Sequence, residues 1–271
     1  MKRYYTRACN FYYGAKSKIL VNKNLSLPLH NIKEISFDQI EIITRSSKKK
    51  INISNIGDLP TSLRNKTIFD LKKITSKKKN FSNLKLNKIP NILGVLNLTP
   101  DSFSDGGKFN TKNKAIDQAN KLLNSGANLI DIGGESTRPG SDSISEKLEW
   151  SRINQILKLL SKKLPISLDT RKSNLMKKGI EMGVKLINDI SGLEYDVKTI
   201  NVLKKSKTPF VLQHSKGDPK NMQNRPIYKN ELLDIYDFFE NKINYLRSIG
   251  IYHDNIIIDP GIGFGKNLKH N

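Results

Sequence analysis

Several features that would indicate other classes of protein are missing from this 271-residue sequence. It contains one cysteine, Cys9, which excludes an internal disulfide bond and any zinc site built from cysteines. No stretch reaches the roughly 18 apolar residues that a membrane-spanning helix needs. The basic first ten residues lack an apolar core segment, so they do not form a secretory signal. These absences are typical of a cytoplasmic protein without a membrane anchor.

Acidic residues are scarce relative to basic ones, and the imbalance is uneven along the chain. There are 47 Lys and Arg against 25 Asp and Glu, a formal net charge of +22. Residues 1–90 hold 20 of the basic residues and only 5 of the acidic ones. A basic surface can bind nucleic acid, a membrane surface or anionic phosphate substrates. Nucleic acid is the less favoured partner, because no aromatic residues for base stacking interleave with the runs Lys48–Lys50 and Lys77–Lys79.

The chain divides into regions of different character. Residues 1–74 are expected to form a small, irregular region of unknown role, in which Ile40–Thr44 and Lys50–Ser54 read as two strands joined by a polar turn. Residues 75–90, rich in Lys, Asn and Ser, are expected to be a linker. Over residues 91–271, short apolar runs alternate with segments of helical periodicity, which indicates a separate α/β domain.

Six apolar runs in this domain predict the strands of a parallel sheet, because helical segments separate them. The predicted strands are Ile92–Leu98, Asn128–Ile132, Pro165–Leu168, Val184–Ile187, Pro209–Leu212 and Asn255–Ile258. The predicted helices are Lys112–Ser125, Glu146–Lys163 with Ser145 as its N-cap, Ser173–Met182, Asp196–Lys205 and Glu231–Ile249.

Two architectures fit this alternation, a doubly wound sheet and a TIM (β/α)8 barrel. Polar motifs follow nearly every predicted strand, which favours the barrel, because the strand-end loops of a barrel all converge on one mouth. A doubly wound sheet instead gathers its ligand at one switch point. A barrel needs roughly 250 residues, whereas residues 92–271 number 180. We therefore expect a barrel that lacks about its last two β–α units.

The strand-end motifs resemble those of one family. N-I-L-G-V-L-N-L-T-P-D-S-F-S-D-G-G at 91–107 and D-I-G-G-E-S-T-R-P-G at 131–140 resemble the two signature segments of the dihydropteroate synthase family. Its later strand ends are matched in order by S-L-D-T-R-K at 167–172, I-N-D-I-S-G at 187–192, H-S-K-G-D-P-K-N-M-Q at 214–223 and I-D-P-G-I-G-F-G-K at 258–266. The resemblance covers residues 91–271 nearly continuously.

The resemblance implies a pterin-binding TIM barrel that acts in folate biosynthesis. Members of the family condense a hydroxymethyl-dihydropterin diphosphate with 4-aminobenzoate, which releases diphosphate and forms dihydropteroate. The reaction requires Mg²⁺, and the family is the target of sulfonamides. Members commonly form homodimers through their late helices.

By this resemblance, the residues that bind the pterin edge are Asp169, Asn188 and Asp259. The chemistry agrees, because a pterin has a donor and acceptor edge like that of guanine, and carboxylates pair with its amino and ring N–H groups. Asp169 and Asp259 end two strands that a barrel would place across its mouth from each other. The alternative is that Asp169 caps a loop and that Asn188 and Asp189 form a turn. Asp189 itself is expected to be structural.

The resemblance also assigns the diphosphate and the metal ion to the end of the first strand. Asn97 would help to hold the Mg²⁺–diphosphate, and Asp101 would lie on a mobile loop that closes over it, so both are predicted to be catalytic. Oxygen ligands suit Mg²⁺, which keeps most of its waters, and the departing diphosphate needs such charge. Asn97 has an alternative role as a strand-end amide bonded within the fold. His214 is expected to pack or to bond a loop.

The second substrate, 4-aminobenzoate, needs an aromatic slot. The residues expected to form or neighbour it are Phe103, Thr137, Arg138, Pro139 and Phe264. Arg138 would also screen phosphate charge. For Phe103 the alternative is a hydrophobic anchor of its loop, and Lys266 is expected to support the rim of the barrel.

The sequence departs from the family pattern in two places. Gln213 and Ser215 stand where the family often has apolar residues. The family's lysine after strand seven, and its arginine and histidine after strand eight, have no counterpart, so we expect the chain as given to be incomplete and inactive. Two rival interpretations stay open: a methyltetrahydrofolate-dependent methyltransferase, disfavoured by the motifs at 99–107 and 136–140, and a pterin-binding module without catalysis.

Overall fold

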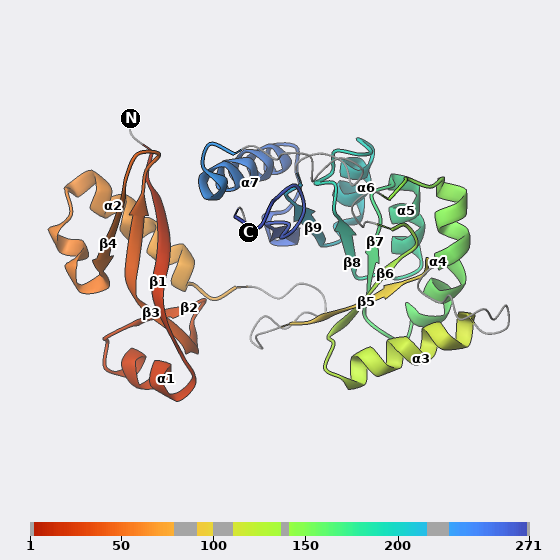
Figure 1. Cartoon of the computed structure of the whole chain (residues 1–271), viewed down its shortest axis with the longest axis horizontal. Helices are drawn as coiled ribbons and strands as arrows, with labels where there is room; N and C mark the ends of the chain where they lie inside the picture. The colour runs from red at the N-terminus through yellow and green to blue at the C-terminus, as the bar shows by residue number, and fades with distance from the viewer. Residues whose placement is uncertain (1–2, 79–90, 100–110, 137–140, 216–227, 270–271) are drawn as a thin grey trace. The chain divides into compact units, whose positions relative to one another are not determined.

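A computed structural model of the chain describes residues 3–78, 91–99, 111–136, 141–215 and 228–269. The chain forms two compact units, Met1–Lys79 and Asn80–Asn271, and each has its own sheet (Figure 1). The boundary between the units falls within the segment 75–90, where the composition of the sequence suggests a linker.

The N-terminal unit is a regular antiparallel sheet with helices, so the expectation of an irregular region is wrong. Strand β3 pairs with β1 along one side and with β2 and β4 along the other. The predicted strand pair is present as the β3–β4 hairpin, in which Ile40 lies opposite Ile51. The elements are β1 (Tyr5–Tyr13), α1 (Gly14–Asn22), β2 (Leu27–Leu29), β3 (Ile32–Ile43), β4 (Lys48–Asn52), the 3-10 helix η1 (Ile53–Asp58) and α2 (Thr61–Thr75).

Strand β1 shows why regular structure was hard to predict in this unit. It mixes polar and aromatic residues without a regular alternation, and Asn10 has a positive φ of 55° although the register with β3 continues past it. Its polar side chains bond within the unit: the Thr6 hydroxyl donates to Asp70 at 2.8 Å, and the Asn10 amide donates to Asp38 at 2.8 Å. The apolar core of the unit is Phe37, Ile40, Ile42, Leu59 and Leu71.

The lysine run Lys48–Lys50 lies on β4, which among the described strands pairs with β3 alone and is therefore an edge strand. Its lysine side chains are exposed. Charged side chains on an edge strand disfavour pairing with the sheets of other molecules. This run therefore has a structural explanation that requires no anionic partner.

The C-terminal unit is a parallel sheet of six strands whose connections contain helices (Figure 1). The strands are β5 (Leu93–Asn97), β6 (Leu129–Gly133), β7 (Ile166–Asp169), β8 (Leu186–Asp189), β9 (Phe210–Gln213) and β10 (Ile256–Asp259). The helices are α3 (Thr111–Asn124), α4 (Glu146–Leu160), α5 (Ser173–Glu181), α6 (Thr199–Ser206), α7 (Glu231–Ser248) and the 3-10 helix η3 (His253–Asn255).

The strand order decides between the two architectures that fit the sequence. The strands lie in the order β10-β9-β8-β7-β6-β5, so each strand pairs with the one before it in the chain. A doubly wound sheet reverses its order at a switch point, and this sheet has no such reversal. The sheet therefore corresponds to six successive strands of a (β/α)8 barrel, as predicted.

The two faces of the sheet differ in what they bury. Ile130 and Ile132 of β6 belong to the large apolar core that the helices share with the sheet. Leu129 faces the opposite way, because side chains alternate along a strand, and it belongs to a smaller cluster with Leu186 and Val211. Asp131 and Gly133 lie on the same face of β6 as Leu129, and this face would be the inside of a barrel.

The predicted N-cap of α4 is present, whereas α4 ends at Leu160 rather than Lys163 and α6 begins at Thr199 rather than Asp196. The Ser145 side chain accepts a hydrogen bond from the Leu148 backbone N–H at 3.2 Å and so caps α4, as predicted. Asn230 caps α7 in the same way through Leu233. Within the part of the chain that the structure describes, no helix is both long and apolar enough to cross a membrane.

Candidate active site

A row of polar side chains crosses the carboxyl ends of four neighbouring strands. Asn97 of β5 lies opposite Gly133 of β6, Gly133 lies opposite Asp169 of β7, and Asp169 lies opposite Asn188 of β8. Three of the predicted site residues, Asn97, Asp169 and Asn188, are thus brought into one row. The parallel register places them together, because it aligns equivalent positions of successive strands.

Gly133 provides the space in the middle of this row. A Cβ atom at Gly133 would lie 3.2 Å from Asp169 Oδ2 and 3.5 Å from Asn97 Oδ1. The side chains of Asn97 and Asp169 therefore both lean over the glycine from its two sides. A Cβ at Gly133 would crowd Asp169 Oδ2 and fill the space beside Asn97 Oδ1, so the glycine favours this arrangement.

Asp131 is a site residue that the sequence analysis missed. It lies two residues before Gly133 on the same face of β6, its side chain is buried, and its Oδ2 accepts a hydrogen bond from Asn188 Nδ2 at 2.9 Å. Its other oxygen, Oδ1, is buried without a hydrogen-bond partner among the described residues. Burial raises the pKa of Asp131, and the Ser167 hydroxyl and the Asn188 amide moderate the increase. The signal in the sequence was a carboxylate within an apolar strand.

Asp169 lies in a strongly acidic environment. Burial raises its pKa well above the ordinary value, and the negative charge of Asp131 is the next cause. Glu149, Asp189 and Glu135 add smaller effects in the same direction. Groups with strongly shifted pKa values cluster at functional sites, so this carboxyl is the leading candidate for ligand contact.

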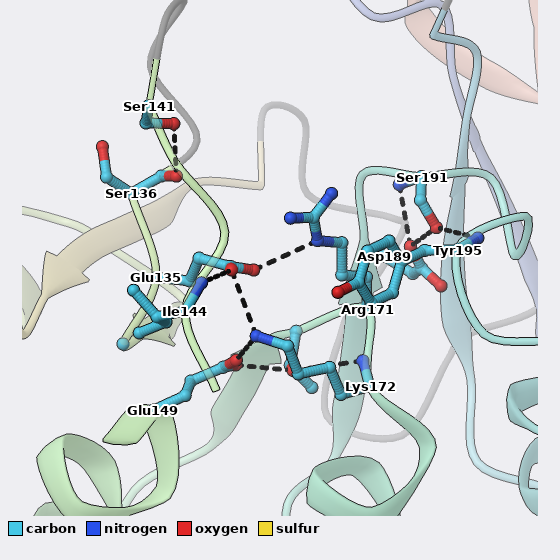
Figure 2. A network of polar contacts seen from close by, with 12 residues as sticks. Glu135, Ser136, Ser141, Ile144, Glu149, Arg171, Lys172, Asp189, Ser191 and Tyr195 are labelled. Atoms are coloured by element: carbon cyan, nitrogen blue, oxygen red, sulfur yellow. Dashed lines mark hydrogen bonds and ion pairs between the residues drawn. The ribbon is translucent and has the colours of Figure 1, made fainter. Parts of the chain in front are cut away.

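An ion-pair network joins the segments after β6 and β7 to helix α4, and it was also absent from the sequence analysis (Figure 2). Lys172 Nζ lies 3.1 Å from Glu135 Oε1 and 2.5 Å from Glu149 Oε2, and Arg171 Nε lies 3.1 Å from Glu135 Oε2. All four side chains are nearly inaccessible to solvent. The Glu135 carboxylate also accepts the Ile144 backbone N–H at 2.8 Å, which joins the end of β6 to the segment before α4.

Gly134 allows α4 to approach this network. A Cβ atom there would lie 2.8 Å from Ile153 Cγ2 and 3.0 Å from the Glu149 carbonyl oxygen, closer than packing permits. The Arg152 guanidinium donates to the Gly134 carbonyl at 2.7 Å. The two glycines that end the D-I-G-G segment thus serve different purposes, since Gly133 makes room for polar side chains and Gly134 admits a helix.

Asp189 follows Asn188 but bonds to its own loop. Its Oδ1 accepts hydrogen bonds from the Ser191 backbone N–H at 2.8 Å and from the Ser191 hydroxyl at 2.6 Å. Burial raises its pKa to about 6. These contacts fit the expected structural role.

Asp259 ends β10, three strands away from Asp169 in the sheet. Its Oδ1 accepts the Gly261 backbone N–H at 2.7 Å, and its carbonyl accepts the His214 N–H at 2.9 Å. The carboxylate therefore caps its own loop, and it is half-buried. Its role toward a pterin stays a prediction.

Lys266 and His214 support the loop after β10, as expected for Lys266 at the rim. The buried Lys266 Nζ lies 3.0 Å from the carbonyl oxygens of Gly261 and Phe264 and 3.0 Å from His214 Nδ1. The His214 ring also packs edge-on against Phe238, with centroids 4.9 Å apart. Burial lowers the pKa of Lys266 to about 8. Phe264, predicted at the aminobenzoate slot, is half-buried in this loop.

Five of the predicted site residues belong to segments that the structure does not describe. Asp101, Phe103, Thr137, Arg138 and Pro139 lie outside the described residues. No group of three or more His, Cys, Asp or Glu side chains suited to a metal ion occurs in the described part of the chain. The assignment of Mg²⁺ to Asn97 therefore stays a prediction.

The fold and the row of polar side chains define an α/β-barrel protein with a ligand site at its strand ends. Residues 93–271 match the family of pterin binding enzymes, and the chain belongs to this family. It is 40% identical to the dihydropteroate synthase of Synechocystis sp. over 182 residues, which cover 66% of this chain and 63% of that protein. The chain thus spans somewhat less than two thirds of that relative's length.

Solved structures give the same result. The dihydropteroate synthase of Yersinia pestis, in complex with a sulfonamide drug, is 42% identical with a TM-score of 0.62, and the match covers 67% of this chain and 66% of that chain. The dihydropteroate synthase of Xanthomonas albilineans, with 4-aminobenzoic acid, is 34% identical with a TM-score of 0.62, over 67% of this chain and 65% of that chain.

Proposed function

We propose that this chain belongs to a dihydropteroate synthase that joins hydroxymethyl-dihydropterin diphosphate to 4-aminobenzoate and releases diphosphate. The observation that carries the proposal is the strand-end row of Asn97, Asp169 and Asn188, two of whose members were expected to bind the pterin. The similarity to dihydropteroate synthases, one of them with 4-aminobenzoic acid, supports it.

In this proposal the pterin is bound through its amino and ring N–H groups. Asp169 and Asn188 lie side by side in the sheet and supply oxygen acceptors at one edge of the row. A carboxyl group that accepts one N–H donor at each of its oxygens must be ionised, and the burial of Asp169 opposes its ionisation. A ligand with two N–H donors relieves that cost, so such a ligand is favoured over one with acceptors. Asp259 would add a third contact from β10.

The proposal includes Mg²⁺ at Asn97. The Asn97 side chain is exposed, so its Oδ1 is an oxygen donor within reach of solvent. Such a donor fits Mg²⁺, which binds few protein ligands and keeps several waters. When bound, the ion would neutralise charge on the departing diphosphate. Asp101 is proposed to close over that group.

The remaining assignments rest on the family. Phe264 and the residues Phe103, Thr137, Arg138 and Pro139 are proposed to surround 4-aminobenzoate. We further propose a cytoplasmic location, small-molecule substrates and no nucleic-acid or membrane partner, with homodimers as the assembly of the complete protein.

Pterin binding and turnover by the whole protein test this function. Calorimetric titration with 6-hydroxymethylpterin should show binding that Asp169→Asn weakens by at least tenfold. Diphosphate release should require both the pterin diphosphate and 4-aminobenzoate, and should stop when Mg²⁺ is chelated.

The matched control is Asp117→Asn, which changes an exposed carboxylate on α3. It should leave both measurements unchanged. Binding without diphosphate release would support a non-catalytic pterin module instead. Failure of the wild-type protein to bind the pterin would refute the proposed function.

A further inference from the structure

Asp131 has an environment that a structural role does not explain. Its neighbours in β6 are Ile130 and Ile132, and its own side chain is 6% exposed. It has no cationic partner among the ion pairs of the described residues, and one of its oxygens has no hydrogen-bond partner there. A buried carboxylate whose neighbouring donors, the Ser167 hydroxyl and the Asn188 amide, are both neutral opposes folding, so an apolar residue would suit the strand better.

The position of Asp131 relative to the site is set by the strand register. Asp131 pairs with Ser167 of β7, whereas Gly133, two residues further on, pairs with Asp169. The row of Asp169 and Asn188 therefore lies one step closer to the strand ends than Asp131 does. The hydrogen bond from Asn188 Nδ2 to Asp131 Oδ2, 2.9 Å long, runs from this row toward the interior of the sheet's inner face.

This hydrogen bond decides which way the Asn188 amide faces. A side-chain amide has a donor end and an acceptor end, and the two can exchange by rotation of the amide. An ionised carboxylate only accepts hydrogen bonds, so it holds the Nδ2 end and rejects Oδ1. With Nδ2 bonded to Asp131, the Oδ1 end of Asn188 makes no hydrogen bond with the described residues, and Asn188 itself is the strand neighbour of Asp169.

We propose that Asp131 is a positioning residue that holds the Asn188 amide with its oxygen toward the ligand, so that the site selects a ligand edge with two adjacent N–H donors. The inference rests on the proposed function, since it concerns the same pterin site. Asp131 does not touch the ligand in this scheme. It acts through Asn188, and the unfavourable burial of its carboxylate is the cost of a fixed amide orientation.

The inference predicts a loss of selectivity rather than a simple loss of binding. A pterin carries an amino group beside a ring N–H, whereas the matching lumazine carries an oxygen in place of the amino group. With Asn188 Oδ1 held outward, the wild-type site should reject the lumazine. Without Asp131, the Asn188 amide can rotate and offer its N–H group to that oxygen, so discrimination should decrease.

The test compares binding of 6-hydroxymethylpterin and 6-hydroxymethyllumazine to the whole protein at pH 8. Asp131→Val replaces the carboxylate by a strand-forming apolar side chain. We expect it to reduce the ratio of the two affinities by about fivefold or more, which is the order of one hydrogen bond. The control Asp117→Asn should keep the wild-type ratio.

Each result has one meaning. A wild-type protein that discriminates, with an unchanged ratio in a folded Asp131→Val variant, would overturn the inference and leave the proposed function intact. A wild-type protein that binds neither compound would overturn the proposed function itself. A reduced ratio with the melting temperature maintained would support positioning, because a structural role predicts loss of stability.

A second measurement needs only the wild-type protein and decides the matter if the variant does not fold. Asn174 offers an internal comparison, because its Nδ2 also donates to a carboxylate, Glu146, at 2.9 Å but at an exposed position. Hydrogen exchange of the Asn188 side-chain amide, followed by NMR, should be at least tenfold slower than that of Asn174. Equal rates would show that the Asn188 amide is not held, and would overturn the inference.

Discussion

Replacement of Asp189 by asparagine should change how stability depends on pH. Asp189 is fully buried, and its pKa is raised from 3.8 to about 6, chiefly by burial. The Asp189→Asn variant keeps an oxygen for the two hydrogen bonds from Ser191 and removes the ionisable group. The new Nδ2 would occupy the place of Oδ2, which has no partner among the described residues. The variant should therefore have a lower free energy of unfolding by an amount that does not depend on pH.

The magnitude follows from the difference between the two pKa values. In the folded protein Asp189 binds a proton up to pH 6, whereas in the unfolded chain it releases the proton near pH 3.8. The folded state therefore holds the extra proton between these values, and the free energy of unfolding falls as pH rises. At about 1.4 kcal/mol per pKa unit, the loss in wild type amounts to about 3 kcal/mol between pH 4 and 7. The variant lacks this loss.

Urea unfolding at several pH values between 4 and 7.5 measures the effect. The stability of Asp189→Asn relative to wild type should increase by about 3 kcal/mol across this range. Other carboxyl groups titrate here, but they affect both proteins equally and cancel in the difference. The exposed Asp117→Asn variant should follow the wild-type profile. Parallel profiles of wild type and Asp189→Asn would show that burial does not raise the pKa of this group.

Three further substitutions test packing and charge. Lys172→Met should lower the free energy of unfolding by about 3–5 kcal/mol in urea titrations, because it leaves two buried glutamates without their ammonium partner. The control Lys177→Met changes an exposed lysine and should alter the free energy of unfolding by less than about 0.5 kcal/mol. Gly133→Ala should weaken 6-hydroxymethylpterin binding about tenfold by calorimetry while the fold stays stable, since its Cβ crowds the strand-end oxygens. Gly179→Ala should lower the free energy of unfolding by about 1–3 kcal/mol, because its Cβ would lie 2.5 Å from Leu168 Cδ2. Adding Leu168→Val should recover part of that loss. If the effects of the two substitutions were fully additive, the clash would be refuted.

The fold of the C-terminal unit could be predicted from the sequence because its strands are short apolar runs between helices. Pro165–Leu168, for example, predicts β7 to within one residue at each end. The N-terminal unit could not be predicted equally well, because Tyr5–Tyr13 has no clear alternation of polar and apolar residues. Its regularity depends on pairing with β3, which a local pattern does not reveal.

Site residues at strand ends could be predicted from the sequence. Site residues inside strands, or those whose partners are distant in the sequence, could not. Asp169 and Asn188 are polar residues at strand ends, which marks them as candidates. Asp131 lies inside an apolar strand, and its importance depends on a partner 57 positions away. The ion pair of Glu149 and Lys172 joins a helix to a loop, and the sequence carries no local signal for it.

The order of the strands has a consequence for how this unit is made. Since β6 pairs with β5, and each later strand with its predecessor, every pairing closes a loop of one helix and its connections. A growing chain can therefore join β5 to β6 as soon as α3 and β6 have left the ribosome, and every later strand adds to an edge that already exists. The polar row would be completed in the same order, from Asn97 through Asp169 to Asn188, as each strand is added to the sheet.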